Sequence, residues 1–232
     1  MENPQQRRKI MGNISINKLG GLSIIIGPWL ALIFYFLQPG GTFIDAVDPA
    51  DPIATITAIV GNPGLGQLTG ILIPIGLLIF LYGFFVLRGT LRGGNGDALG
   101  GYGVQFLMFG VIGWVISSGM LLAIAGTTDT NPAVAVPTFG SLYGASQGIG
   151  TIAGLLAGLG FLLVALALST RDEFNKIFAL VAAVAAVAAV IFVLIGALDS
   201  TQLQLMNSLV GICYVIHSLW MVTIGLVLLK QD

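Results

Sequence analysis

Long apolar stretches separated by short polar segments dominate the chain. A membrane-spanning helix needs roughly 20 mostly apolar residues, because each residue rises about 1.5 Å across a hydrocarbon core about 30 Å thick. Six stretches meet this requirement and contain no Asp, Glu, Lys or Arg: 19–37, 65–87, 102–124, 148–168, 177–198 and 206–229. The pattern predicts an all-α integral membrane protein, a six-transmembrane-helix bundle spanning 19–229 between an N-terminal segment, 1–18, and a short tail, 230–232.

The basic residues indicate how these helices are oriented. With six spans, every Lys and Arg falls on one side of the membrane: Arg7, Arg8, Lys9, Lys18, Arg88, Arg92, Arg171, Lys176 and Lys230. The opposite loops carry five aspartates, at 45, 48, 51, 129 and 199, and no basic residue. Because cytoplasmic loops are enriched in Lys and Arg, both termini are expected in the cytoplasm. We expect a multi-pass protein of the cell (plasma) membrane.

Two outer loops are long enough to hold further structure. In the first, about 38–64, Asp51-Pro52 supplies a helix cap followed by proline at the first helical position, and Gly61 suits a helix end. The apolar positions between them are Ile53, Ile56, Ile59 and Val60. This stripe predicts a short interfacial helix on the outer face. Asn131-Pro132 and Pro137 punctuate the second loop, which ends where the fourth span begins at Gly148.

Small residues predict where helices approach closely. Gly150, Gly154 and Gly158 repeat every four residues on one face of the fourth span. Such ladders let helix backbones pack together in lipid. Two interpretations stay open: an interface with a second copy or other membrane subunits, or packing within one bundle, which we favour.

A weak internal repeat accompanies these glycines. Leu-Gly-Gly opens the first and third spans, and segment 66–72 resembles segment 150–156. Repeated helical hairpins would produce this similarity, and so would the shared Gly/Leu-rich composition of the helices.

Composition narrows the class of protein. Hydrophobic residues make up 56% of the chain and charged residues 8%, and the mean hydropathy is +0.98. These values exclude an ordinary soluble domain and a disordered chain. Nine basic against ten acidic residues leave no positive surplus for nucleic acid. The lipid bilayer is the expected partner, and the single cysteine cannot form an internal disulfide.

Residues that would support catalysis are missing from the expected spans. The sequence holds no paired intramembrane carboxylates, metal-binding helix motif, phosphate-binding loop or nucleotide fingerprint. An ion-coupled transporter usually keeps a charge at membrane depth, and none is present. Asp45, Asp48 and Asp51 lack a calcium-loop spacing and are interpreted as a solvated acidic loop. We therefore expect no enzyme activity, no cofactor and no metal.

The only histidine, His217, lies close to the middle of the sixth span. Cys213, Tyr214, Trp220 and Asn207 share its broad helix face, and Ser117 and Ser118 lie at similar depth in the third span. The imidazole could bind a ligand within the membrane. Alternatively, it could hydrogen-bond a group on another helix. We favour this second interpretation, because one histidine supplies too few ligands for haem, zinc or copper.

Two functions fit these features. The first is a non-catalytic accessory or scaffolding subunit, or a self-associating bundle. The alternative is a protein that binds or transports a small neutral or lipid-like molecule in a cavity near His217, between helices that Pro28 and Pro74 are expected to kink. A cavity lined by Ser117, Ser118, Asn207 and His217 would favour the second, and a filled core with an exposed glycine ladder would favour the first.

Overall fold

The computed structural model describes residues 14–128 and 131–231, and within them it is helical with no β-strand. Six helices are long and apolar enough to cross a membrane, as the sequence predicts. They are α2 (Ile16–Phe36), α4 (Pro63–Leu91), α5 (Asp97–Ala125), α6 (Pro132–Leu168), α7 (Lys176–Leu198) and α8 (Leu203–Leu229).

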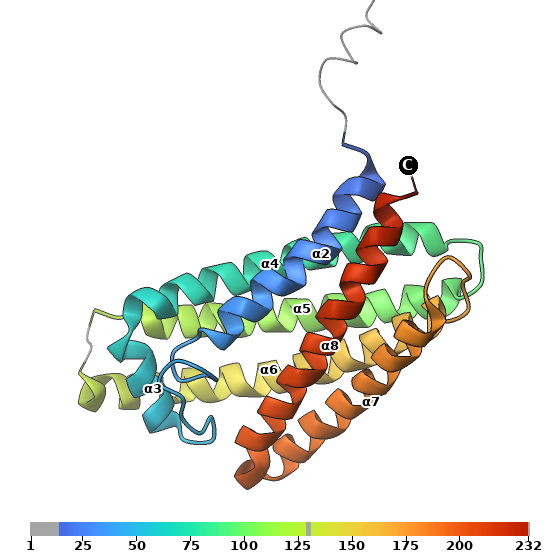
Figure 1. The fold of residues 1–232 in the computed structure, drawn as a ribbon. Coiled ribbons are helices and arrows are strands. Elements are labelled where there is room, and N and C mark those ends of the chain that lie inside the picture. Colours follow the sequence, from blue (N-terminus) through green and yellow to red (C-terminus); the bar gives the residue numbers. More distant parts are fainter. Residues whose placement is uncertain (1–13, 129–130, 232) are drawn as a thin grey trace, which may run out of the picture.

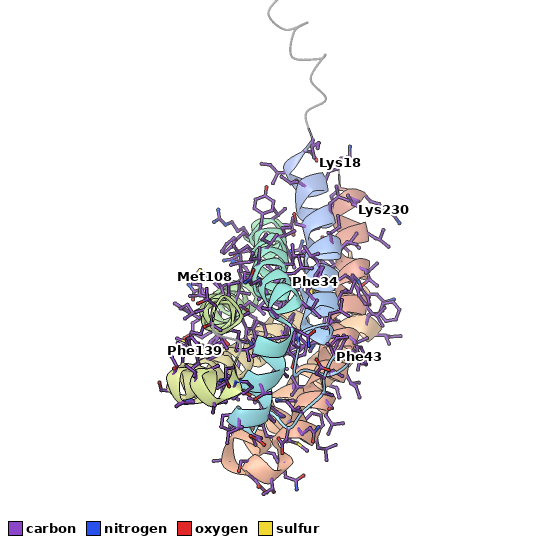
Figure 2. All side chains as sticks on the ribbon, turned by 90° about the vertical axis from the view of Figure 1, so that its left-hand side faces the viewer. Lys18, Phe34, Phe43, Met108, Phe139 and Lys230 are labelled. Atoms are coloured by element: carbon purple, nitrogen blue, oxygen red, sulfur yellow. The ribbon has the colours of Figure 1, made fainter. Side chains whose placement is uncertain are left out.

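The six helices form a closed ring. Each packs against the next along the chain, and α8 returns to pack against α2 (Figure 1). The Asn17 side chain donates a hydrogen bond to the Gln231 carbonyl at 3.5 Å. Lys18 and Lys230 accordingly lie together at one end of the bundle (Figure 2). We call this the terminal end, and the opposite end, which carries residues 37–62 and 199–202, the loop end.

The described basic residues all belong to the terminal end, since they flank helix ends that meet there. Arg7, Arg8 and Lys9 lie outside the described residues.

We expect Thr42→Cys and Ser200→Cys, both exposed at the loop end, to react with an impermeant thiol reagent in intact cells. Asn95→Cys, exposed at the terminal end, should react only after the membrane is opened, because positively charged segments stay in the cytoplasm. Reaction of all three from outside would contradict this orientation; Cys213→Ala supplies a cysteine-free background.

The short helix in the first loop forms where the sequence places it. The Asp51 carboxylate accepts hydrogen bonds from the backbone of Ile53 and Ala54 at 2.9 and 3.0 Å, and α3 (Pro52–Gly61) follows. Ile56, Ile59 and Val60 are buried against α5 and α6, whereas Ile53 is 61% exposed. The helix thus covers the loop end of the bundle, and its position at a membrane interface stays a prediction.

The prediction of a loop before the fourth span is wrong. The helix α6 begins at Pro132, sixteen residues before the predicted start at Gly148. Asn131 accepts a hydrogen bond from the Ala133 backbone at 3.0 Å, and Pro132 occupies the first helical turn, where its missing N–H is not needed. Pro137 removes one backbone donor without ending the helix. The two prolines that indicated a loop therefore belong to the start of a longer helix, which packs on α3.

Glycines pair the helices in a repeated pattern. An ideal Cβ on Gly83 of α4 would lie 2.9 Å from the Gly20 carbonyl oxygen of α2, and one on Gly160 of α6 would lie 2.8 Å from that of Gly103 in α5. A second close contact follows seven residues away in both pairs, at Gly27 and at Gly110. The α2–α4 and α5–α6 hairpins therefore pack alike. Segments 66–72 and 150–156, which resemble each other in sequence, do not lie at equivalent positions in these two hairpins. The structural repeat therefore aligns the hairpins in a different register from the one that the sequence similarity suggests.

Candidate functional site

The ring of helices is hollow toward the loop end. A cavity of about 400 Å³ is lined by residues of all six long helices, of α3 and of the loop 38–49. This volume falls within the range of about 300–1,000 Å³ typical of small-molecule sites. Along α8 the lining runs from Leu203 to Met221, past the middle of that helix. The cavity therefore extends from the loop end deep into the membrane-spanning part of the bundle.

Toward the terminal end the ring is filled. Phe84, Leu87, Leu107, Val164 and Ile224 come from four different helices, and none is more than 1% exposed. They belong to one hydrophobic cluster, and they lie between the cavity and the terminal end. We call these five residues the plug, because they separate the cavity from the terminal end.

The wall of the cavity is uncharged. Among the described residues that line it, polar groups come only from Ser, Thr, Asn, Gln, Tyr, His and Trp side chains and from the backbone. In a low-dielectric interior, a charged ligand would need a charged or strongly polar partner. The lining therefore suits an uncharged molecule.

The loop over the mouth of the cavity is held by two α6 side chains. The Tyr143 hydroxyl donates a hydrogen bond to the Pro49 carbonyl at 2.8 Å, and the Gln147 amide donates to the same oxygen at 3.4 Å. Tyr143 is 4% exposed. Sequence reasoning missed this pair because it assigned residues before Gly148 to a loop. Their four-residue spacing, typical of one helix face, was the available signal.

Aromatic side chains surround the deep end of the cavity. The Phe161 ring stacks on the His217 imidazole with centroids 4.2 Å apart and planes inclined by 16°. The Trp114 ring meets Tyr214 edge-on at 5.5 Å. Phe80 completes this group, which we call the aromatic floor: Phe80, Trp114, Phe161 and Tyr214. Sequence reasoning found only Tyr214, because aromatic residues on wholly apolar helices do not reveal which face they occupy.

His217 joins two helices while lining the cavity. It is fully buried, and its Nε2 lies 3.1 Å from the Ala182 carbonyl oxygen of α7. A carbonyl only accepts, so Nε2 carries the proton and Nδ1 of the neutral ring is an acceptor. Nδ1 has no hydrogen-bond partner in the described part of the chain; the Cys213 backbone, one turn earlier, approaches the ring without suitable bond geometry.

Tyr214 offers a second polar atom without a partner. Its hydroxyl is inaccessible to water and forms no hydrogen bond within the described residues. An ideal Cβ on Gly154 would lie 3.8 Å from this oxygen, so the hydroxyl faces the wall formed by α6. Because buried polar groups are nearly always hydrogen-bonded, two such atoms one helical turn apart mark the deep end of the cavity as a candidate site.

The structure brings together five of the seven residues proposed from the sequence. Ser117, Ser118, Asn207, Tyr214 and His217 line the cavity. The Ser117 hydroxyl also shares a hydrogen bond of 2.8 Å with that of Ser146. Cys213 packs with Ala185 and Ala189, and Trp220 packs in the core, so neither lines the cavity.

The glycine ladder faces the protein's own helices and cavity. An ideal Cβ on Gly158 would lie 2.6 Å from a Val190 methyl group of α7, which makes this the close contact of the ladder. Gly150 and Gly154 line the cavity. The ladder is therefore covered within one chain and presents no free surface to a second copy.

The aspartates of the first loop serve its local structure. Asp51 caps α3, Asp48 accepts a hydrogen bond from the Ala50 backbone at 2.9 Å, and Asp45 binds the Asn62 side chain. Within the described residues, no three His, Cys, Asp or Glu side chains are grouped to hold a metal ion.

Comparison with protein-family models, with curated proteins and with solved structures found no match. The evidence that bears on function is therefore the geometry of the cavity.

Proposed function

We propose that this membrane protein binds a small uncharged, largely apolar or lipid-like molecule in the cavity between its helices. The observation that carries the proposal is the cavity itself, which has the volume of a ligand site and an uncharged wall. It is lined by Ser117, Ser118, Asn207 and His217, the combination that favours binding over assembly.

The glycine ladder gives less support to a scaffolding or self-associating role. Gly158 contacts α7 of the same chain, and Gly150 and Gly154 face the cavity. The outward surfaces of the long helices instead carry large apolar side chains, such as Val184, which is 72% exposed, and Leu219, which is 56% exposed. Such surfaces suit contact with lipid.

Binding without catalysis or steady conduction fits the cavity best. Its wall offers neither a paired acid and base nor a nucleophile beside a base among the described residues. The plug closes the terminal side, so passage across the membrane would require a rearrangement of packed side chains. We therefore propose a non-catalytic binding protein that receives its ligand from the loop end.

A matched pair of α6 variants tests the proposal. Gly150 lines the cavity, and an ideal Cβ there would meet only the Ser117 hydroxyl, at 3.6 Å. Gly148 is exposed on the same helix, and no described atom outside its own turn lies within 4 Å of its Cβ position. Gly150→Leu should fill the cavity, whereas Gly148→Leu makes the same chemical change outside it.

Native mass spectrometry of gently extracted protein measures the outcome. We expect the unaltered protein and Gly148→Leu to retain a small molecule in stoichiometric amount, and Gly150→Leu to lose it while remaining folded. An identical set of retained molecules in all three proteins, or none in any of them, would contradict a ligand in this cavity.

A further inference from the structure

We infer that the molecule bound in the cavity carries a hydroxyl group on an apolar body, as an apolar alcohol or phenol does, and that this hydroxyl lies between Tyr214 and His217. The inference rests on the proposed function and adds the chemical class and orientation of the ligand.

Several polar side chains near the mouth are already engaged, although Gln38 and Asn207 form no side-chain hydrogen bond within the described residues. Tyr143 and Gln147 hold the Pro49 carbonyl, and the hydroxyl groups of Ser117 and Ser146 bond to each other. The Ser208 hydroxyl donates to the Gln204 carbonyl at 3.0 Å. These groups stabilise the mouth and its helices, and a ligand would have to break existing bonds to use them.

The deep end has two polar atoms without a partner, and because both are inaccessible to water, a ligand reaches them by displacing the side chains that cover them. Nδ1 of His217 can only accept a hydrogen bond, since Nε2 donates to Ala182. The Tyr214 hydroxyl can donate or accept. One ligand hydroxyl satisfies both, because it can donate its proton to Nδ1 and accept from the tyrosine through its oxygen lone pairs. An ether or a ketone can satisfy the tyrosine alone.

The remaining surface determines the rest of the ligand. Trp114, Phe161 and Phe80 surround this end, and the described lining carries no charged side chain. A cavity of about 400 Å³ is near the lower limit of ligand sites, so a compact apolar body fits better than a bulky one. The ligand therefore enters with its hydroxyl leading and packs its apolar part against the aromatic floor.

Two probes of nearly equal shape test the hydroxyl. 4-Butylphenol can donate a hydrogen bond, whereas 4-butylanisole carries a methyl group in place of the phenolic hydrogen. Equilibrium dialysis against protein in lipid nanodiscs, with protein-free nanodiscs subtracted, measures specific binding of each. We expect the phenol to bind roughly three- to tenfold more tightly, which corresponds to one net hydrogen bond.

Tyr214→Phe removes the unpartnered hydroxyl and keeps the ring. We expect it to weaken binding of 4-butylphenol by roughly three- to tenfold and to leave the melting temperature of the ligand-free protein unchanged, because no bond within the protein is lost. Tyr82→Phe is the matched control, since Tyr82 is 39% exposed and lies outside this cavity. It should bind both probes as the unaltered protein does.

The outcomes separate this inference from the proposed function. Equal binding of the two probes, with both excluded by Gly150→Leu, would overturn recognition of a hydroxyl and leave cavity binding standing. Binding that Gly150→Leu does not reduce would contradict the cavity as the site. A lowered melting temperature for ligand-free Tyr214→Phe, or no specific binding of the phenol, would also overturn the inference.

Discussion

Gly27→Leu is expected to leave almost no folded protein after extraction. An ideal Cβ at this position of α2 would lie 2.7 Å from the Phe80 Cα and 2.8 Å from the Gly76 carbonyl oxygen of α4, and closer still to the Phe80 amide nitrogen. These are backbone atoms, which cannot turn aside as a side chain can. The two helices would therefore have to separate. Gly76 of α4 shows that the backbones are equally close on the other side of this contact, because an ideal Cβ on Gly76 would lie 2.6 Å from the Ala31 amide nitrogen of α2.

The expected destabilisation exceeds that of ordinary overpacking, which costs about 1–3 kcal/mol. Gly119→Leu is the control, because Gly119 is exposed in α5 and no described atom outside its own turn lies within 4 Å of its Cβ position. Size-exclusion chromatography and thermal melting of both variants, in the same detergent, measure the effect. Similar melting curves for Gly27→Leu and the unaltered protein would show that α2 and α4 do not meet at this glycine.

The sequence predicts the helices well because the membrane imposes a simple rule. Only a length of about 20 apolar residues is needed to identify a span, and every expected span lies within an observed helix to within one residue. The short helix α3 could be predicted equally well, because Asp51 is a typical N-cap residue and Pro52 suits the first helical position. The start of α6 was missed because proline is compatible with a helix start as well as with a loop.

The cavity could be predicted only in part. Asn207 and His217 stand out as polar residues within apolar spans, and both line it. Phe161 and Trp114 could not be assigned, because helices that are apolar on every side carry little periodic signal to indicate which face turns inward. The partner of His217, the Ala182 carbonyl, lies on another helix and depends on how α7 packs against α8.

His217→Leu is expected to lower the stability of the folded protein by about 1–2 kcal/mol. It removes the hydrogen bond from Nε2 to Ala182, and hydrogen bonds between membrane helices contribute about 0.6 kcal/mol on average and up to about 1.7. It also removes the stacked contact with Phe161, a kind of ring contact worth about 0.5–1.5 kcal/mol that the leucine replaces only in part. The melting temperature in detergent should therefore fall.

His217→Gln is the matched control for this change. The glutamine amide can donate a hydrogen bond as Nε2 does, so it should recover part of the stability that leucine loses, although it cannot reproduce the stacked ring. Its amide oxygen is an acceptor, so glutamine keeps both a donor and an acceptor and lacks only the ring. Thermal melting should then rank the proteins as unaltered, His217→Gln and His217→Leu in decreasing stability. Equal melting of all three would mean that the bond between α7 and α8 contributes nothing to stability, which would contradict this prediction.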